Sequence, residues 1–454
     1  MRAVHGYGYE DGRGYGHGHG HGYGYEPGYG RAGAGPERVV AELAGALFPP
    51  VLRRKDQRRR AEQYVRGLLA VDGRKSMRNI ARVVGGSAAE QGLHHFITDS
   101  TWDWAAMRAA LARHLQHVMP PQAWVVQPMS IPKVGEHSVG VDRGCTPRPG
   151  QSAGGQRAFG VWFASEEMSA PVNWRLHLPP HWLRETERRR RADIPEEAVE
   201  ETLEEGAAAA VLDSMPSWGL PRTPVVLGSA AAEDRAATEV RAATEVRAAA
   251  EVRAAVLRFA AADVPLLMRI PATTGLTVAD PSMPGFGASR LTAHQILDSV
   301  KALRRPVRWA SPEGGAATVR GSLVVAARVA LPDAAGPVRP RPGRPGGAAR
   351  SRGLLLLGEW HDPRRPPAEF WLTGMDRTPV PALLRLTKLC RRVAADGLAV
   401  GGQVGLRDFE GRSFHGWHRH ITLASVAHAA RILADGSRSA YPGALDAYAT
   451  GVPA

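Results

Sequence analysis

Arginine carries most of the chemistry that this chain of 454 residues offers. There are 58 basic and 44 acidic residues, a net charge of +14, and only five of the basic residues are lysines. Such a charge suits a polyanionic partner, whose phosphates arginine side chains would bind. GC-rich coding sequence produces the same excess of arginine, which leaves codon composition as an alternative explanation. Two arginine runs, at residues 53–60 and 188–191, have a solvated face as their default interpretation.

The cysteine content and the apolar runs indicate the compartment. Cys145 and Cys390 are the only cysteines, and two isolated thiols make neither a disulfide framework nor a zinc site. No apolar run approaches the roughly 20 residues that span a bilayer. The first residues are Gly, Tyr and His without the apolar segment of a signal peptide. We therefore expect a soluble, cytoplasmic protein with no membrane contact.

Residues 1–36 have low complexity, with glycine alternating with tyrosine and histidine. Glycine at every second position makes ordering entropically costly and leaves nothing to bury, so we expect this tail to be disordered. His17, His19 and His21 could hold a metal weakly. Slippage within a repetitive Gly-Tyr-His tract is the simpler origin of these histidines.

Helical patterns follow from residue 37 to about residue 120. Apolar residues recur at helical spacing within 39–47, 61–69, 77–84, 93–97 and 107–118. We expect the first helix to stop at Pro49-Pro50, and Ser87 with Glu90 to form a capping box. Two short helices around Gly85-Gly86 fit a helix-turn-helix and an ordinary helical bundle equally well.

Strand patterns dominate from Trp124 onward. The predicted order is three strands (124–131, 157–164 and 172–178), an amphipathic helix (199–215) and a strand (224–227). This β-β-β-α-β order predicts an α/β fold. Because Val125-Val126 and Val225-Val226 are apolar on consecutive residues, we expect them to lie on adjacent parallel central strands. A strand at 264–270 follows, then a β-rich region at 280–378 with a Pro/Arg/Gly linker at 337–352, and helices near 380–395 and 417–433.

A six-residue unit repeats three times within Arg235–Arg253. Its alanine, arginine and glutamate predict a strong helix. Six residues do not match the helical period, so Val240, Val246 and Val252 spiral around the helix and a coiled coil is not expected. We interpret the repeat as a tandem expansion of one exposed helix.

Five segments, in their order and spacing, resemble DDE-type insertion-sequence transposases of the insertion-sequence 701 type. They are WVVQPMSIPK at Trp124–Lys133, HSVGV at His137–Val141, SAPVNWRLHLP at Ser169–Pro179, GLRDFEGRS at Gly405–Ser413 and GWHRH at Gly416–His420. The resemblance spans roughly residues 60 to 430. It implies an RNase H-like mixed-sheet core with an N-terminal helical region, and a β-rich insertion before the C-terminal helices. It also implies double-stranded DNA as partner and Mg²⁺ as the cofactor of active members.

The resemblance places the family's three catalytic acids where this chain has none. The first metal-binding Asp falls at Gln127, the second at Gly228, and the Glu at or beside Ala394. Two-metal phosphoryl transfer needs carboxylate oxygens around hard cations, and a neutral amide is at best a weak ligand. We therefore expect no intact catalytic residue, no metal site and no bound cofactor.

Other acids lie near these positions in sequence. They are Glu136, Asp142, Glu233, Asp234 and Asp396. Two residues along a helix correspond to about 200°, so Asp396 should face away from a site at Ala394. Glu233 and Asp234 lie several residues past the end of the predicted strand 224–227. A working triad built from these acids is the alternative that the geometry disfavours.

Several basic residues match positions that the family has near its substrate. The candidates for DNA contact are Lys133, Arg143, Arg175, Arg412, His418 and Arg419. Such side chains give affinity for phosphates without reading sequence. For His418 and His420 a structural role is the alternative. They are two residues apart on a predicted helix, so at most one of them would face the protein core.

The leading hypothesis is a DNA-binding protein of the transposase family that has lost catalysis. The alternatives are an active metal-dependent nuclease or transposase with relocated acids, and an interaction protein that keeps only the scaffold. The sequence does not fix an oligomeric state. The expected segments are a disordered tail (1–36), a helical region that is a candidate for DNA binding (37–120), the first part of the core (121–279), a β-rich insertion (280–378), C-terminal helices that complete the core (379–435) and a second tail (436–454).

Overall fold

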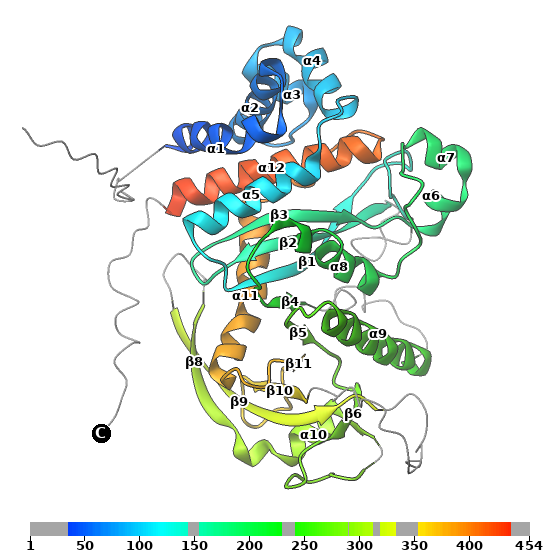
Figure 1. Ribbon diagram of the computed structural model, residues 1–454, viewed down its shortest axis with the longest axis vertical. Helices are drawn as coiled ribbons and strands as arrows, with labels where there is room; N and C mark the ends of the chain where they lie inside the picture. Colours follow the sequence, from blue (N-terminus) through cyan, green and yellow to red (C-terminus); the bar gives the residue numbers. More distant parts are fainter. Residues whose placement is uncertain are drawn as a thin grey trace, which may run out of the picture.

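The computed structural model describes residues 35–143, 154–228, 241–288, 290–311, 318–332 and 353–436 (Figure 1). Some of the predicted features lie outside these residues. They are the N-terminal tail up to residue 34, Cys145, Glu233, Asp234, the linker 337–352 and the C-terminal tail from residue 437.

One mixed sheet organises the described part of the chain. Its strands are β1 (Ala123–Pro132), β2 (Gly155–Ala164), β3 (Ser169–Leu176), β4 (Val225–Leu227), β5 (Leu266–Arg269), β6 (Gly275–Val278), β7 (Leu291–Thr292), β8 (Arg305–Ser311), β9 (Thr318–Ala330), β10 (Leu354–Trp360) and β11 (Glu369–Thr373). The order is β3-β2-β1-β4-β5-β11-β10-β9-β6-β7. β8 is outside this order and pairs antiparallel with residues 318–324 of β9.

The first five strands form the predicted RNase H-like core. β1, β4 and β5 are parallel, and β2 and β3 are antiparallel to their neighbours. Val125 pairs with Val226, which in turn pairs with Leu267. Consecutive buried apolar residues are typical of strands that are covered on both faces. The prediction that Val125-Val126 and Val225-Val226 lie on adjacent parallel strands is confirmed.

Helices α8 (Leu203–Leu212) and α11 (Val380–Ala399) cover the two faces of this core. A Cβ on Gly206 of α8 would lie 3.1 Å from the ring of Phe159, whereas a Cβ on Gly397 of α11 would lie 3.3 Å from the ring of Trp162. These two β2 residues are three apart, so their side chains point to opposite faces. The close helix–strand contact at both points depends on glycine.

The predicted β-rich insertion does not form a sheet of its own. β11 pairs antiparallel with β5, with Trp371 opposite Arg269, so β9, β10 and β11 extend the core sheet. Two further helices flank this half, α9 (Arg241–Ala261) and α10 (Ala293–Ser299). The described part of the six-residue repeat is helical, as predicted. Within residues 249–261, where the burial of α9 is described, Val252, Ala255 and Phe259 are buried.

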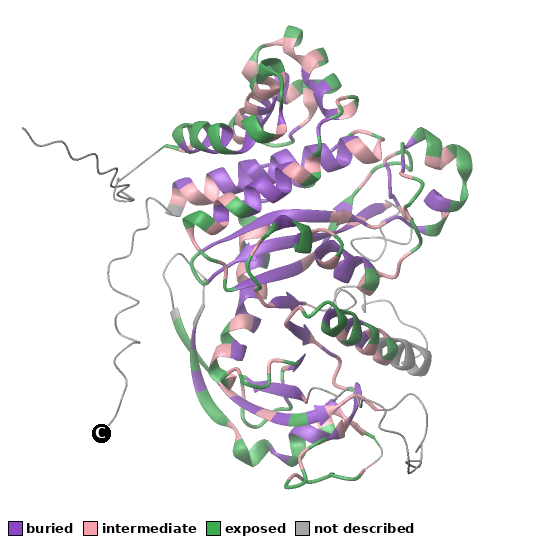
Figure 2. Ribbon diagram, viewed as in Figure 1, coloured by how far each residue is buried: buried purple, intermediate pink, exposed green. Residues whose placement is uncertain are grey.

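Helices α1, α2, α4 and α5 contact the C-terminal helix α12 (Phe414–Gly436), and both α12 and α5 pack on β3 (Figures 1 and 2). The bounds of the N-terminal helices are α1 (Pro36–Val51), α2 (Lys55–Ala70), α3 (Met77–Val84), α4 (Ser87–Thr98) and α5 (Trp104–Val118); the short α6 (Pro180–Arg184) and α7 (Thr186–Arg191) follow β3. Among the described residues, no helix is long and apolar enough to cross a membrane.

Two helix boundaries differ from the predictions. α1 continues through Pro49 and Pro50 to Val51. Prolines lack a backbone N–H, so in the last turn they remove only the final backbone hydrogen bonds of the helix. The capping box at Ser87 is wrong: Ser87 is already helical, Gly86 is the N-cap, and no side chain caps this end. The capping boxes that form are Thr202 with Glu205 and Thr292 with Gln295.

α12 is buried all around between residues 416 and 430, so each of its polar side chains requires a partner inside the protein. Arg108 of α5 is the partner of two of these side chains, Thr422 and His418, and it also bonds to β3. Its guanidinium donates to Thr422 Oγ1 (2.8 Å), to Asn173 Oδ1 (3.1 Å) and to the carbonyl of Trp174 (2.9 Å). It also lies 3.0 Å from His418 Nδ1. Burial lowers the pKa of Arg108 to about 9.

Two further histidines of α12 are fully buried. His420 bonds to the Tyr64 hydroxyl through Nδ1 and to the Gly405 carbonyl through Nε2, both at 2.8 Å. His428 lies with its Nε2 3.4 Å from the Asp396 carbonyl. Burial lowers the pKa of each to about 4, so both are neutral in the folded protein near neutral pH.

We predict that these histidines make the fold acid-sensitive between pH 6.5 and 4. The unfolded chain binds protons in this window while the folded chain does not, so stability is full above pH 6.5 and falls as the pH drops toward 4. A depression from 6.5 to about 4 corresponds to about 3 kcal/mol per histidine at the lower end. The free energy of unfolding, measured with urea, should fall between pH 7 and pH 4.5 in both proteins. The fall should be smaller in His420→Gln than in wild type, by about 2–3 kcal/mol.

The control is His94→Gln, which makes the same replacement at an exposed position of α4. Equal pH dependence in wild type and His420→Gln would contradict the burial of a neutral His420.

Candidate functional site

The residues at the carboxyl ends of the parallel strands form one row. Val126, Leu227 and Met268 are paired across β1, β4 and β5. The next residues along these strands are Gln127, Gly228 and Arg269. In-register neighbours on parallel strands point to the same face, so these three positions adjoin at one edge of the core.

The structure brings Gln127 and Gly228 together beneath α11. A Cβ on Gly228 would lie 3.9 Å from Gln127 Oε1 and 3.9 Å from Cys390 Sγ. Ala394 lies one turn further along α11 and is exposed. The three positions at which the resemblance expects acids thus come from β1, from the end of β4 and from the helix that crosses them.

Cys390 is not equipped to replace a carboxylate. Burial, reinforced by the negative charge of Glu369, raises the pKa of its thiol to about 12, against the opposing effect of Arg269 and Lys388. Near neutral pH the side chain is therefore a neutral thiol, whereas a metal ligand or nucleophile needs the thiolate.

Glu369 is an acid near this row that the sequence did not reveal. Its carboxylate accepts a hydrogen bond from Trp371 Nε1 at 3.0 Å and pairs with Arg391 at 3.5 Å. It reaches the core only because β11 pairs with β5, a contact between segments about 100 residues apart. The sequence carries no signal for that pairing. Among the described residues, no group of three or more His, Cys, Asp or Glu side chains could hold a metal ion.

The described acids named from the sequence lie elsewhere. Glu136 pairs with Arg143 on the surface. Asp142 forms a backbone bridge with Gly155 at the end of the β1–β2 hairpin. The carboxylate of Asp396 accepts from the Ser169 amide (3.1 Å) and hydroxyl (2.7 Å), at the beginning of β3.

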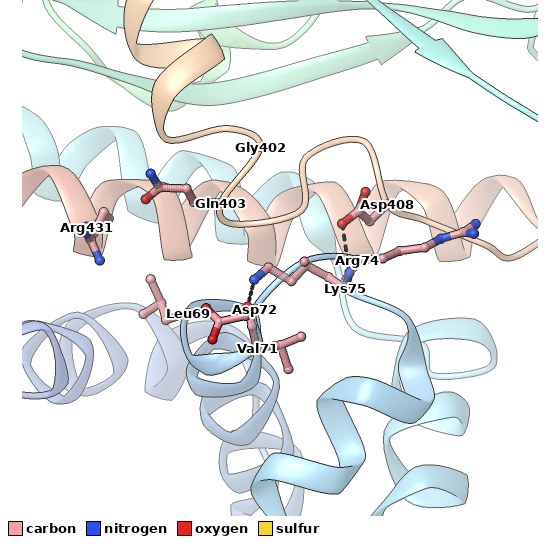
Figure 3. Close-up of a pocket in the computed structure, with 10 residues that line it drawn as sticks. Leu69, Val71, Asp72, Arg74, Lys75, Gly402, Gln403, Asp408 and Arg431 are labelled. Carbon is pink, nitrogen blue, oxygen red and sulfur yellow. Dashed lines mark hydrogen bonds between the residues drawn. The ribbon is translucent and has the colours of Figure 1, made fainter.

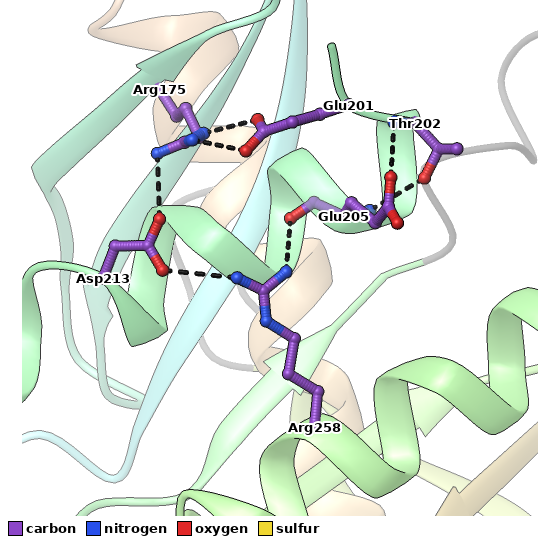
Figure 4. A network of polar contacts seen from close by, with 6 residues as sticks. All are labelled: Arg175, Glu201, Thr202, Glu205, Asp213 and Arg258. Atoms are coloured by element: carbon purple, nitrogen blue, oxygen red, sulfur yellow. Dashed lines mark hydrogen bonds and ion pairs between the residues drawn. The ribbon is translucent and has the colours of Figure 1, made fainter. Parts of the chain in front are cut away.

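Arg175, predicted to contact DNA, is held by two carboxylates (Figure 4). Its Nε donates to Glu201 Oε2 at 2.8 Å, and its Nη1 lies 3.3 Å from Asp213 Oδ2. Asp213 also binds Arg258 of α9 at 3.3 Å. These contacts connect β3, α8 and α9. They leave Arg175 with a structural role in this conformation.

His418 and Arg419, also predicted to contact DNA, lie in the core. Arg419 donates to the carbonyls of Ile97 (3.1 Å) and Thr98 (2.8 Å), the last residues of α4. A cation at this end of a helix satisfies free carbonyls and complements the helix dipole. Burial, followed by the charge of Arg108, lowers the pKa of His418 well below its usual value. Their burial conflicts with the predicted phosphate contact.

The remaining three candidates differ in exposure. Lys133 is half-buried at the end of β1 and donates to the Phe409 carbonyl; burial and then the charge of Arg74 lower its pKa to about 8. Arg143 is exposed but paired with Glu136. Arg412 is exposed on the loop before α12.

A surface pocket of about 720 Å³ lies close to Lys133, between the α2–α3 loop and the loop after α11 (Figure 3). Its lining includes Asp72, Arg74, Lys75 and Asp408. The Lys75 amide donates to Asp408 Oδ2 at 2.8 Å, and Arg74 pairs with Glu410 at 2.9 Å. The mixed charges join the N-terminal helices to the C-terminal loop and give the pocket no clear preference for an anion.

Positive charge is concentrated on the N-terminal helices instead. Residues 53–86 contain eleven basic and three acidic residues, a net charge of +8, which is more than half of the chain's total. The exposed basic residues of this segment are Arg53, Arg54, Lys55, Arg59, Arg74, Arg78 and Arg82. Within this basic surface on α2 and α3, only the run at residues 53–60 was interpreted from the sequence, as a solvated face; the basic residues on α3 were not singled out.

Comparison with known proteins agrees with this architecture. Residues 47–267, just under half of the chain, match the family model of the DDE superfamily endonucleases. The match includes β1 to β4 and therefore both Gln127 and Gly228. No curated protein matches the chain. The family match supports a DDE-type, transposase-like family for this part of the molecule.

We predict that restoring acids at two positions creates a metal site. Gln127→Asp/Gly228→Asp would place two carboxylates side by side, the ligand type that Mg²⁺ and Mn²⁺ prefer. Isothermal titration with Mn²⁺ should give at least about tenfold tighter binding, about 1.4 kcal/mol, than the isosteric Gln127→Asn/Gly228→Asn control. Equal affinity in the two variants, each shown to be folded by circular dichroism, would mean that these positions do not converge.

Proposed function

We propose that this protein binds duplex DNA with a transposase-type architecture but neither cuts nor joins strands. The observation that carries the proposal is the row at the carboxyl edge of the core. There Gln127 and Gly228 adjoin Cys390, and the nearby carboxylate of Glu369 is engaged by Arg391 and Trp371. Within the described part of the chain, no group of three acidic, histidine or cysteine side chains could supply the ligands of two-metal phosphoryl transfer.

The basic surface on α2 and α3 supports DNA as the partner. Arg78 and Arg82 are exposed on α3, and Arg53 and Arg59 are exposed on or beside α2, whereas Arg54 pairs with Asp56 at 3.1 Å. In contrast, the arginine run of α7 is partly neutralised, since Arg190 and Arg191 share Glu187 and Arg188 pairs with Glu185. A surface with unbalanced positive charge releases counterions from DNA, which is the main source of non-specific affinity.

Cleavage separates this proposal from an active nuclease with relocated acids. Purified protein incubated with Mg²⁺ or Mn²⁺ should leave linear and supercoiled DNA intact. Cleavage that chelator abolishes, and that Asp142→Ala or Glu369→Ala also abolishes, would overturn the proposal in favour of a relocated site.

Salt dependence separates DNA binding from a scaffold-only role. If about four to six phosphates are contacted, the affinity should fall with a log–log salt slope near −4 to −5. Arg78→Ala/Arg82→Ala should flatten that slope by about two, because each arginine removes one phosphate contact. Arg190→Ala/Arg191→Ala is the control, since it removes the same charge from α7 and should leave the slope unchanged. A flat salt dependence in wild type would indicate that the charge is compositional.

A further inference from the structure

Arg269 is a half-buried cation at the carboxyl edge of the core, where β5 ends. Trp371 lies opposite it on β11, so the two side chains lie on the same face of the sheet. Within the described part of the chain, the Arg269 guanidinium has neither an ion pair nor a hydrogen bond. A guanidinium carries five N–H donors, so Arg269 keeps its full donor set for a ligand.

The nearby cations of α11, in contrast, are each neutralised by one carboxylate. Arg391 pairs with Glu369 at 3.5 Å. Lys388 pairs with Glu359, and both of these side chains are buried. These two pairs together with Arg269 contain three cations and two carboxylates, which leaves one positive charge, and that charge belongs to Arg269.

Gly228 leaves open space beside this charge. A Cβ on Gly228 would meet no atom closer than 3.9 Å, and the atoms at that distance are Gln127 Oε1 and Cys390 Sγ. Arg269 adjoins the same place, since its charge opposes the rise in the pKa of the Cys390 thiol that burial and Glu369 cause. The position that a side chain would take at residue 228 is therefore open to an atom of a ligand.

The Gln127 amide is a second uncommitted polar group at this edge. Gln127 is half-buried, and among the described residues its side chain makes no hydrogen bond. Its NH₂ group can donate to an oxygen of a ligand. A guanidinium can donate two parallel hydrogen bonds to a phosphate, and partial burial strengthens such charge-assisted bonds. The edge thus combines one net positive charge, an amide donor and open space, which suits a phosphate group.

We propose that this edge binds a phosphate group directly, without a metal ion, through Arg269 and Gln127. Two-metal sites hold phosphate through cations that carboxylates bind. Here the positive charge is part of the protein, so binding should persist when divalent ions are removed. The inference rests on the proposed DNA binding for its ligand, a backbone phosphate, and adds a contact of the core to those of α2 and α3.

The first experiment measures the binding of radiolabelled inorganic phosphate to the full-length protein by equilibrium dialysis in the presence of EDTA. Arg269→Gln should bind phosphate about tenfold more weakly than wild type, or worse, because it removes the charge-assisted hydrogen bonds. Arg269→Lys keeps the charge without the paired donors and should retain more of the affinity. Arg190→Gln is the control, since Arg190 lies on the exposed α7 and is already paired with Glu187.

A second pair of variants separates charge from space. Gly228→Asp and Gly228→Asn fill the open position with side chains of the same shape, but the first adds a negative charge. Gly228→Asp should therefore bind phosphate in EDTA about tenfold more weakly than Gly228→Asn. Circular dichroism checks that each variant is folded. Equal phosphate affinity in wild type, Arg269→Gln and Gly228→Asp would overturn the proposal.

Duplex DNA binding in EDTA identifies the source of the phosphate. If a backbone phosphate occupies the site, Arg269→Gln should flatten the log–log salt slope by about one. An unchanged slope, together with weakened binding of inorganic phosphate, would assign the site to a free phosphate instead of DNA. Failure of wild type to bind DNA at low salt, with phosphate binding intact, would refute the proposed DNA binding and leave the phosphate site in place.

Discussion

The burial of α12 is the constraint on which the rest of the molecule depends. A helix enclosed on every side, yet carrying three histidines, an arginine, a threonine and a serine between residues 418 and 428, is stable only if each polar group finds a partner. α5 provides Arg108, α2 provides Tyr64, and α4 provides its terminal carbonyls. The same contacts therefore give these α12 side chains at least one partner each and fix the N-terminal helices against β3. Among the described residues, Arg419 Nε and His428 Nδ1 are buried without a hydrogen-bond partner.

Arg108 shows how this works without an ion pair. Its bonds go to a hydroxyl, an amide oxygen, carbonyls and an imidazole, all of them neutral acceptors. A buried charge of this kind is costly unless all of its donors are used. The arrangement is consequently specific: replacement of Asn173 or Thr422 would leave the guanidinium short of acceptors in the core.

The core could be predicted from sequence because its signals are local. Consecutive valines at 125–126 and 225–226 report strands covered on both faces, and the alternation of strands and helices gives the order of the parallel strands. Several of the residues predicted to contact DNA have protein partners that lie far away in sequence. Arg175 meets Glu201, and Arg419 meets α4 more than 300 residues earlier. Nothing local distinguishes such an arginine from one at the surface.

The candidate site was predictable in part for the same reason. Gln127 lies within one recognisable strand and Gly228 directly follows another, so their proximity follows from the strand order. Glu369 could not be found in this way, because only the pairing of β11 with β5 brings it to the core. The run of arginines at residues 53–60 is visible in the sequence. Only the ion pairs of the structure show that the similar run of α7 is partly neutralised by Glu185 and Glu187.

The six-residue repeat in α9 has a consequence for how this chain can vary in length. One unit adds about 9 Å of helix and turns whatever precedes it by about 240°. Within residues 249–261, the part of α9 whose burial is described, Val252, Ala255 and Phe259 pack into the core. A unit gained or lost upstream of these residues would leave their packed turns in place. We therefore expect related chains to differ in length at this point without a change in the core.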